Sequence, residues 1–440
     1  MLGIVVSAFP FFAKNSIFSR LENLTPVLAP TAITAIFATF NLLGLLRHEL
    51  WRDEFQAWMV ARDSGSVLEM LQHLRNEGHP ALWHVCLYGL AQWSHKPWLM
   101  QAFHGLIAIA TVSLIQHFSP FKLTHKLLLT FSYFIVYEYA IISRNYGLGA
   151  FFLFAFCAAF CQSRHLFSLA LILVFLSNTN LFGLLLSFSL AILLLFRWWD
   201  QRREEHARSN FVGTLMILGT GWLISVAQIA RPLWEPLLAK HTGRLGFMPL
   251  SQTVAGAVIP EGVEMTFPVK VAYTLVQIWQ AYVPIPTFAR RAFWDTNVLI
   301  DSPFMRVRGL AVGLGLGLLL SAALVVWAVR LLERRSPRLA LVYLVGTGLI
   351  LLFCIQFFWW GSLRHQGYLW LLLVACLWLA QANVFPQALG RSRPLHLGGF
   401  TLLLVLQCFA GVYLYSQDLT YSFLQVSRLP DLFGKTIWSS

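Results

Sequence analysis

Long apolar runs follow one another along the chain, and they constrain its fold more than any other feature of the sequence. The run from 309 to 329, for example, contains no charged residue. About 20 apolar residues are what an α-helix needs to cross the hydrocarbon core of a bilayer. Lipid offers no hydrogen-bond partners, so a spanning segment must satisfy its own backbone, as a helix does. We therefore expect an all-α, polytopic helical membrane protein.

The composition supports this expectation and excludes other classes of protein. Of the 440 residues, 58% are hydrophobic and only 12% are charged, whereas soluble globular domains carry about 25% charged residues. A soluble enzyme and a disordered chain are both excluded. The net charge of +13 lies mostly in short gaps between apolar runs, so membrane orientation explains it and no nucleic-acid partner is expected. The six cysteines show no CxxC spacing and are interpreted as core residues, not metal ligands.

Hydropathy predicts about eleven spanning helices, all of them apolar runs bounded by polar residues. Their ranges are 26–46, 98–118, 125–143, 147–162, 166–177, 180–196, 211–230, 309–329, 339–359, 368–382 and 397–415. The apolar stretch 268–282 fits an interfacial or re-entrant helix. If it spans with a partner, the number of spanning helices rises to about 13.

Arginines concentrate in three short gaps of this topology, 197–210, 330–338 and 385–396. The positive-inside rule places these gaps in the cytoplasm. The segments 47–97 and 231–308 then become long external loops, and most of the acidic residues lie outside. No internal repeat or linker divides the chain, so residues 1–440 are interpreted as one membrane domain.

The first external loop holds a concentration of titratable residues. Trp51 is an expected interface anchor, which places Asp53 and Glu54 at headgroup depth. Asp53 also suits the N-cap of a short helix running to about residue 62, and Ser66 with Glu69 has the spacing of a capping box that opens a second surface helix. One interpretation is that Asp53 and His79 only cap helices. The other is that they face a lipid-accessible cavity and transfer protons.

Two further sites lie at the outer ends of predicted spans. Glu138 falls inside an apolar run, and a charge at the bilayer centre costs about 2.5–3.5 kcal/mol, so Glu138 and Arg144 are expected to face a wet cavity or each other. Their six-residue spacing puts them on different faces of a straight helix. At the second site, Arg364 and His365 offer hydrogen-bond donors suited to a phosphate, although Arg364 could instead be an interfacial anchor.

Two motifs in this loop resemble those of a known family. Trp51-Arg52-Asp53-Glu54, followed by two surface helices and then by His79-Pro80-Ala81-Leu82-Trp83, is similar to the GT-C superfamily of integral membrane glycosyltransferases. The nearest branch contains protein O-mannosyltransferases, lipid A aminoarabinose transferases and related bacterial polyprenyl-phosphate-dependent enzymes. Ala81 stands where that branch usually has a second proline. The match is specific over 51–83 and architectural beyond it.

The resemblance implies roles for individual residues. Asp53 would be the general base and Glu54 its neighbour, orienting the acceptor or a metal. His79 and Arg364 would lie at the donor phosphate. From the residues themselves, we expect His365 and Arg144 to assist there, and Trp51, Glu138 and Tyr146 to line the substrate cavity. Metal use varies across the superfamily, so a divalent metal stays open and no cofactor or metal ligand is assigned.

The expected reaction is an inverting transfer of a sugar from a polyprenyl-phosphate donor to a hydroxyl of a glycolipid, polysaccharide or protein. It would take place at the periplasmic face of the bacterial inner membrane, among membrane lipids, with an ionised Asp53 as base. One alternative is a polytopic transporter or a flippase for lipid-linked sugars, which predicts broken helices at mid-membrane. Another is a non-catalytic assembly subunit of a polysaccharide system.

Overall fold

The computed structural model describes residues 28–74, 78–162, 165–203, 207–242, 266–288, 294–300, 310–357, 362–385 and 397–420. Within these ranges the chain is helical and contains no strand. Nine of the helices in the described ranges are long and apolar enough to cross a membrane. They are α3 (Leu28–Arg47), α7 (Trp98–Phe118), α9 (Asn145–Gln162), α11 (Leu181–Gln201), part of α12 (Ala207–Thr242), α15 (Leu310–Glu333), α16 (Pro337–Phe357), α17 (Leu363–Gln381) and α18 (Gly398–Thr420). The chain is therefore a polytopic helical membrane protein.

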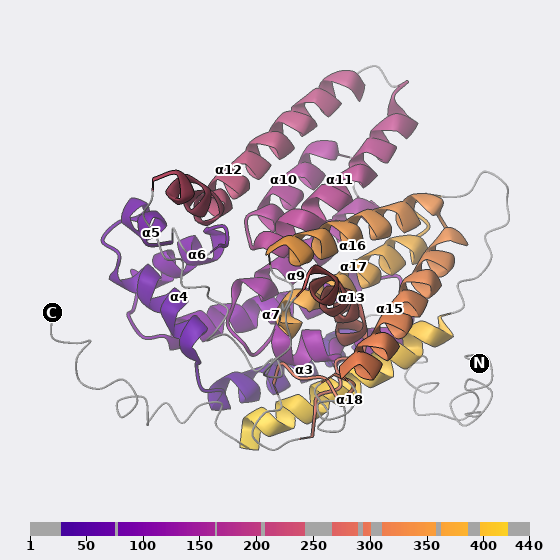
Figure 1. Cartoon of the computed structure of the whole chain (residues 1–440), viewed down its shortest axis with the longest axis horizontal. Helices are drawn as coiled ribbons and strands as arrows, with labels where there is room; N and C mark the ends of the chain where they lie inside the picture. Colours follow the sequence, from indigo (N-terminus) through magenta and orange to yellow (C-terminus); the bar gives the residue numbers. More distant parts are fainter. Residues whose placement is uncertain are drawn as a thin grey trace.

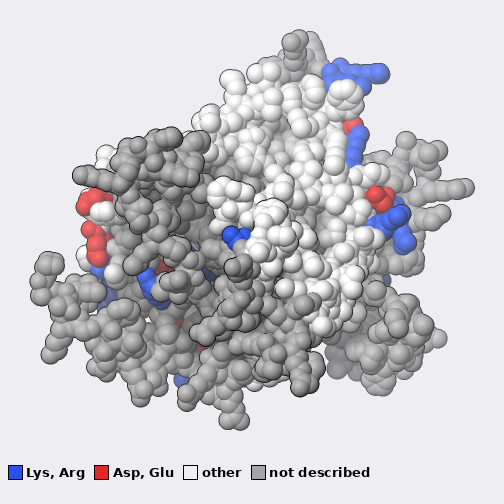
Figure 2. Space-filling view, in the orientation of Figure 1, with Lys and Arg blue, Asp and Glu red and all other residues white. Residues whose placement is uncertain are grey.

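A broad apolar surface surrounds these helices. Leu46, Leu106, Leu223, Leu319 and Leu352 are each more than 60% exposed although they lie on five different helices. In the space-filling view, the described residues form a broad uncharged area, and most of the described charged residues lie at its margins (Figure 2). An apolar surface this extensive is not tolerated in water. It fits a protein whose solvent is lipid.

Two of the eleven predicted spans are not long continuous helices. The predicted span 125–143 is wrong: α8 (Leu123–Thr130) ends after eight residues, and a π-helical turn, η3 (Phe134–Glu138), follows. The predicted span 166–177 is a helix, α10 (Leu166–Ser177), but its 12 residues extend only about 18 Å at 1.5 Å per residue. Hydropathy detects the apolar character of both segments but does not detect where the chain turns.

The loop predicted to be external between α3 and α7 contains three short helices, which lie together at one edge of the molecule (Figure 1). They are α4 (Arg52–Asp63), α5 (Val67–His73) and α6 (Leu82–Ala91). Ser66 caps α5 by accepting a hydrogen bond from the Glu69 amide at 3.2 Å, as predicted. Trp51, not Asp53, is the N-cap of α4. Asp53 therefore lies in the first helical turn, where its side chain is not used for capping.

A separate hydrophobic cluster anchors these three helices to α7 and α9. Its largest buried members, Trp58 and Trp83, come from α4 and α6. The leucines Leu68 and Leu71 of α5 remain exposed on the outside. An amphipathic helix with a free apolar face at the end of a membrane bundle is suited to lie in the interface.

Helix α17 is the centre of the bundle. Every residue from Leu363 to Ala380 is buried, and the helix lies against α9, α11, α13 (Phe267–Tyr282), α15 and α16. Helix α13, predicted as interfacial or re-entrant, has buried residues toward its C-terminal end: Tyr282 bonds to Tyr343 at 2.7 Å between their hydroxyl oxygens. Helix α17 also begins at Leu363, five residues before the predicted start. Arg364 and His365 consequently lie on its first turn instead of in the preceding loop.

Arg197 and Arg335, which come from two of the three Arg-rich gaps, lie at the opposite end of the bundle from the first turn of α17. Residues 386–396 of the third gap lie outside the described residues. Arg335 Nε donates to the carbonyl of Ala380, near the end of α17, at 3.2 Å. Arg197 Nη2 donates to the carbonyl of Phe160, near the end of α9, at 2.7 Å. Since α9 and α17 are each long enough to span a bilayer, their first turns and these arginines lie at opposite ends of the bundle. The first turns of α9 and α17 position the candidate site.

Candidate functional site

Asp53 and Arg364 form the centre of the site. The Nη2 atom of Arg364 lies 3.2 Å from Oδ2 of Asp53, and the side chains are 9% and 29% exposed respectively. Helix α4 supplies the carboxylate and helix α17 supplies the guanidinium. The more open partner is the carboxylate, so it is the group that an incoming molecule reaches first.

Arg144 holds the same turn of α4 through its backbone. Its Nη1 atom donates to the main-chain carbonyl of Asp53 at 2.5 Å. Arg144 precedes the first residue of α9, so α9 and α17 both bring an arginine to Asp53. The contact through the main chain leaves the Asp53 carboxylate available for other partners.

The Arg364 side chain is surrounded by aromatic rings. Its guanidinium carbon lies 4.9 Å from the ring centroid of Trp51 and 5.8 Å from that of Trp294. The Tyr139 hydroxyl donates to the Arg364 carbonyl at 2.6 Å. Two nitrogens of the guanidinium, Nε and Nη1, are buried and have no hydrogen-bond partner. Buried donors without a partner are uncommon, and on an arginine they leave hydrogen-bonding capacity for an anionic ligand.

His79, Tyr146 and His365 form a second group within the site. The Tyr146 hydroxyl lies 3.2 Å from Nε2 of His79 and 2.8 Å from Nε2 of His365. Burial, and then the positive charges of Arg144 and Arg364, lower the pKa of His79 to about 3. His79 is therefore neutral at physiological pH. Its Nδ1 atom is buried and lacks a partner.

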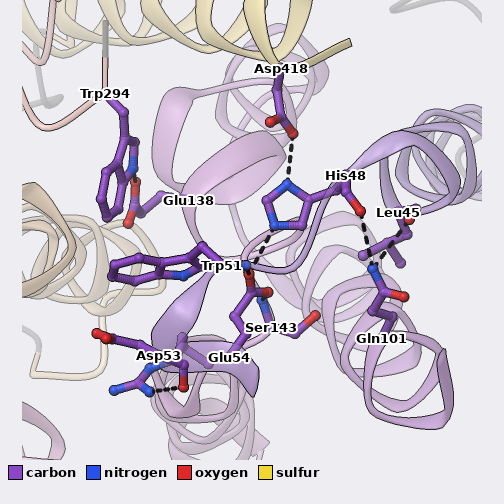
Figure 3. Close-up of polar contacts among 11 residues, drawn as sticks. Leu45, His48, Trp51, Asp53, Glu54, Gln101, Glu138, Ser143, Trp294 and Asp418 are labelled. Atoms are coloured by element: carbon purple, nitrogen blue, oxygen red, sulfur yellow. Dashed lines mark hydrogen bonds and ion pairs between the residues drawn. The ribbon is translucent and has the colours of Figure 1, made fainter. Parts of the chain in front are cut away.

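Glu54 points away from Asp53 into a buried cluster with His48 and Asp418 (Figure 3). Glu54 Oε2 lies 3.0 Å from Nε2 of His48, whose Nδ1 lies 2.9 Å from Oδ2 of Asp418. Glu54 also accepts hydrogen bonds from the main-chain amides of Trp51 and Ser143 at 3.0 and 2.5 Å. Its carboxylate thus ties α4 to the ends of α3 and α18 and to the start of α9. This geometry favours positioning of Asp53 as the role of Glu54.

The pKa of His48 reflects its two carboxylate partners. Burial by itself lowers it, but the charge of Glu54 and the hydrogen bonds to Asp418 and Glu54 outweigh burial and raise the pKa to about 10. Near neutral pH, the stable form of the cluster therefore has a protonated His48 between the Glu54 and Asp418 carboxylates.

Glu138 lies close to the site but does not contact Arg144. Its Oε2 accepts hydrogen bonds from the Tyr133 hydroxyl at 2.5 Å and from Trp294 Nε1 at 3.1 Å. The Trp294 ring meets the Trp51 ring edge to face, with centroids 4.9 Å apart (Figure 3). Glu138 therefore holds the Trp294 indole, which packs against the Trp51 indole, and both rings flank Arg364. The hydrogen bonds from Tyr133 and Trp294 satisfy the buried Glu138 carboxylate, whose partner could not be predicted from the sequence.

Several residues of the site were not predicted from the sequence. Asp295 Oδ1 accepts the amide hydrogen of Leu363, in the first turn of α17, at 2.6 Å. Asp295 and Trp294 come from the second predicted external loop, and His48 and Asp418 come from the ends of helices. No motif marks any of them. The predicted external loop 231–308 also contains Arg231, Arg244, Arg290 and Arg291, which the sequence makes unranked candidates for binding the phosphate. The side chain of Arg231 and the other three arginines lie outside the described residues.

Comparison with known proteins adds no family to this description. No family model, no curated protein and no solved structure matches the chain. Among the described residues, no three His, Cys, Asp or Glu side chains are grouped so that they could hold a metal ion. The six cysteines, all of which lie in the described ranges, are free.

Proposed function

We propose that this protein is a membrane glycosyltransferase that moves a sugar from a polyprenyl-phosphate donor to an acceptor hydroxyl. The observation that carries the proposal is the contact between Asp53 and Arg364 at the end of the bundle opposite Arg197 and Arg335. A carboxylate suited to accept a proton lies next to a guanidinium suited to bind a phosphate. Both belong to a protein whose substrates can arrive through lipid.

The two groups have complementary roles in the proposed reaction. The donor phosphate binds Arg364 through its unpartnered Nε and Nη1 atoms, which weakens the contact of Arg364 with Asp53. Asp53 then takes the proton of the acceptor hydroxyl. The acceptor oxygen bonds to the anomeric carbon as the bond from that carbon to the phosphate oxygen breaks, and the electron pair leaves with the polyprenyl phosphate. Attack opposite the leaving group inverts the anomeric centre.

The remaining residues support this step. Arg144 keeps the backbone of Asp53 in place through the 2.5 Å contact to its carbonyl, while the Asp53 side chain exchanges Arg364 for the acceptor. The Glu54–His48–Asp418 cluster fixes the start of α4 from its buried side. Fixed donors aimed at a developing negative charge are an effective means of stabilising a transition state.

The positive-inside rule supports an external, periplasmic location for the site in a bacterial inner membrane. The site lies at the opposite end of α9 and α17 from Arg197 and Arg335, which the rule places in the cytoplasm. Nucleotide sugars are confined to the cytoplasm, so a donor carried by lipid is the source available at the external face. The acceptor there is a glycolipid, a polysaccharide or a protein.

The experiment is a transfer assay with a matched pair of variants. Purified protein in lipid nanodiscs is incubated with polyprenyl-phosphate sugars of several classes and with lipid, polysaccharide and protein fractions as acceptors. We expect Asp53→Asn to lower transfer by about 10²- to 10⁴-fold, the usual contribution of a general base. Asp63→Asn is the control, because Asp63 is an exposed residue at the other end of the same helix. Transfer by folded Asp53→Asn at the wild-type rate would exclude Asp53 as the base.

A second candidate function, a flippase for lipid-linked sugars, is favoured by one observation. The segment between α8 and α9 is broken by η3 and carries the buried Glu138, and transporters place ions and substrates at broken helices. Movement of a fluorescent polyprenyl-phosphate sugar across proteoliposome membranes, without formation of a glycosylated product, would support the flippase and contradict the transferase.

A further inference from the structure

The hydrogen bonds around Tyr146 determine which nitrogen of His79 carries its proton. The chain of bonds begins at the start of α17, where the main-chain amide of Ser362 donates to Nδ1 of His365 at 3.1 Å. An amide nitrogen can only donate, so Nδ1 of His365 accepts. A neutral imidazole carries one proton, and the Nε2 atom of His365 therefore holds it.

The direction of the next two bonds follows from this assignment. His365 Nε2–H donates to the Tyr146 oxygen at 2.8 Å. The Tyr146 hydroxyl is then free to use its own hydrogen, and Nε2 of His79 lies 3.2 Å away. His79 Nε2 accepts this hydrogen bond, which places the His79 proton on Nδ1.

His79 Nδ1 has no hydrogen-bond partner although it is buried. The same holds for Nε and Nη1 of Arg364 and for Nε of Arg144, and both arginines lie close enough to lower the pKa of His79 through their charge. A buried N–H group without a partner costs about 1–3 kcal/mol. Unpartnered donors on three side chains that influence one another electrostatically point to an acceptor that carries negative charge.

We infer that Tyr146 and His365 are positioning residues that hold His79 as a neutral Nδ1–H donor for the phosphate of the lipid-linked substrate. This inference rests on the proposed function for the identity of the ligand, but the tautomer itself does not depend on it. A neutral donor stabilises the departing phosphate by a hydrogen bond without giving up its proton. The arginines supply positive charge, and the Nδ1–H group of His79 supplies a hydrogen bond of fixed direction to the phosphate.

The tautomer can be measured directly. Nitrogen-15 NMR of protein labelled at histidine distinguishes a protonated ring nitrogen from an unprotonated one, and the His79 signals are assigned by their absence in His79→Asn. We expect wild-type His79 at pH 7 to show a protonated Nδ1 and an unprotonated Nε2. An Nε2–H tautomer or a doubly protonated ring would overturn the inference.

Tyr146→Phe tests the relay, because phenylalanine keeps the ring and cannot donate to His79. We expect this variant to lose the preference for the Nδ1–H tautomer and to raise the KM for donor about tenfold, the scale of one lost hydrogen bond to a charged group. Tyr137→Phe is the control: the Tyr137 hydroxyl is also buried but has no hydrogen-bond partner. An unchanged His79 tautomer in Tyr146→Phe, with the unfolding temperature preserved, would overturn the inference.

Addition of polyprenyl phosphate alone separates this inference from the proposed function. We expect it to shift the His79 Nδ1 signal of the wild type, and a signal that does not move would contradict the role in phosphate binding. If the signal moves but no sugar donor supports transfer, the proposed transferase activity fails while the phosphate site stands.

Discussion

The Nη2 atom of Arg364 lies 3.2 Å from the Oδ2 atom of Asp53, although 311 positions separate the two residues in the chain. Before substrate binds, this contact pairs Asp53, the proposed base, with Arg364, the residue proposed to bind the phosphate. Binding of a phosphate to Arg364 would therefore release the Asp53 carboxylate at the moment when the acceptor needs it.

Arg364→Lys keeps the positive charge but removes the planar fork of donors. We expect the KM for the donor to rise about 10- to 100-fold, since one or two charge-assisted hydrogen bonds are lost. Steady-state kinetics with varied donor concentration measure the change. Arg335→Lys is the matched control, because Arg335 contacts the other end of α17. Equal donor KM values in the two variants would argue against phosphate binding by Arg364.

The His48 cluster predicts a loss of stability in alkali. The pKa of His48 in the folded protein, about 10, lies above its ordinary value of 6.5. The stabilising contribution is therefore complete below about pH 6.5 and is lost as the pH rises toward 10. We expect the unfolding temperature in detergent to fall between pH 7 and 10, and to fall less in His48→Gln.

At pH 6 the same variant removes the cation from a buried carboxylate pair, which typically costs about 3–5 kcal/mol. His117→Gln is the control, since His117 is exposed at the end of α7. A His48→Gln protein that is as stable as wild type at pH 6 would show that the cluster does not hold α4 in place.

Gly367→Ala should disturb the support of Arg364. A methyl group on Gly367 would overlap the Tyr139 hydroxyl and would lie 2.5 Å from ring carbons of Phe134. We expect destabilisation of about 1–3 kcal/mol, typical of an overpacked core, measured by thermal unfolding. Gly348→Ala, on α16, meets no atom within 4 Å and should be neutral or stabilising by up to about 1 kcal/mol. The prediction fails if the two alanine variants unfold alike.

Asp295 tests the contribution of its loop to the first turn of α17. Asp295 has a φ of 57° and accepts the Leu363 amide hydrogen at 2.6 Å. We expect Asp295→Ala to cost about 1 kcal/mol, as for a lost helix cap. Asp295→Asn should cost less, because asparagine retains an acceptor oxygen and tolerates a positive φ. Stability is measured by thermal unfolding, and a larger loss in Asp295→Asn than in Asp295→Ala would contradict this interpretation.

The sequence predicts the helices well wherever an apolar run is long and uninterrupted. It also predicts the surface helices α4 and α5. Ser66 and Glu69 signal the start of α5 locally, whereas the expected N-cap of α4, Asp53, lies two residues after the observed one, Trp51. The break after Thr130 was not predicted. Residues 131–143 are almost as apolar as a span, and the turn there instead allows Glu138 to meet Tyr133 and Trp294. Hydropathy indicates whether a segment is apolar enough for lipid, but it does not indicate where the chain turns within that segment.

The candidate site was predicted in part. The fold brings together six predicted site residues that come from separate stretches of the sequence: Asp53, Arg364, Arg144, His79, Tyr146 and His365. The His48–Asp418 contact joins residues 370 positions apart, and such a pairing leaves no local pattern. The direction of the Glu54 side chain was also unpredictable, since adjacent residues on a helix point to different faces.

The enclosure of α17 has a consequence for how the protein is assembled. Its first turn carries Arg364, His365 and Gln366, and its mean hydropathy of 1.2 is the lowest among the nine candidate spans of the described chain. Alone in a bilayer such a segment would be poorly retained, because nothing would cover its polar end. Its neighbours α9 and α11 are synthesised earlier and can receive it as it leaves the translocation channel. The helix that carries Arg364 therefore joins a bundle that is already partly assembled.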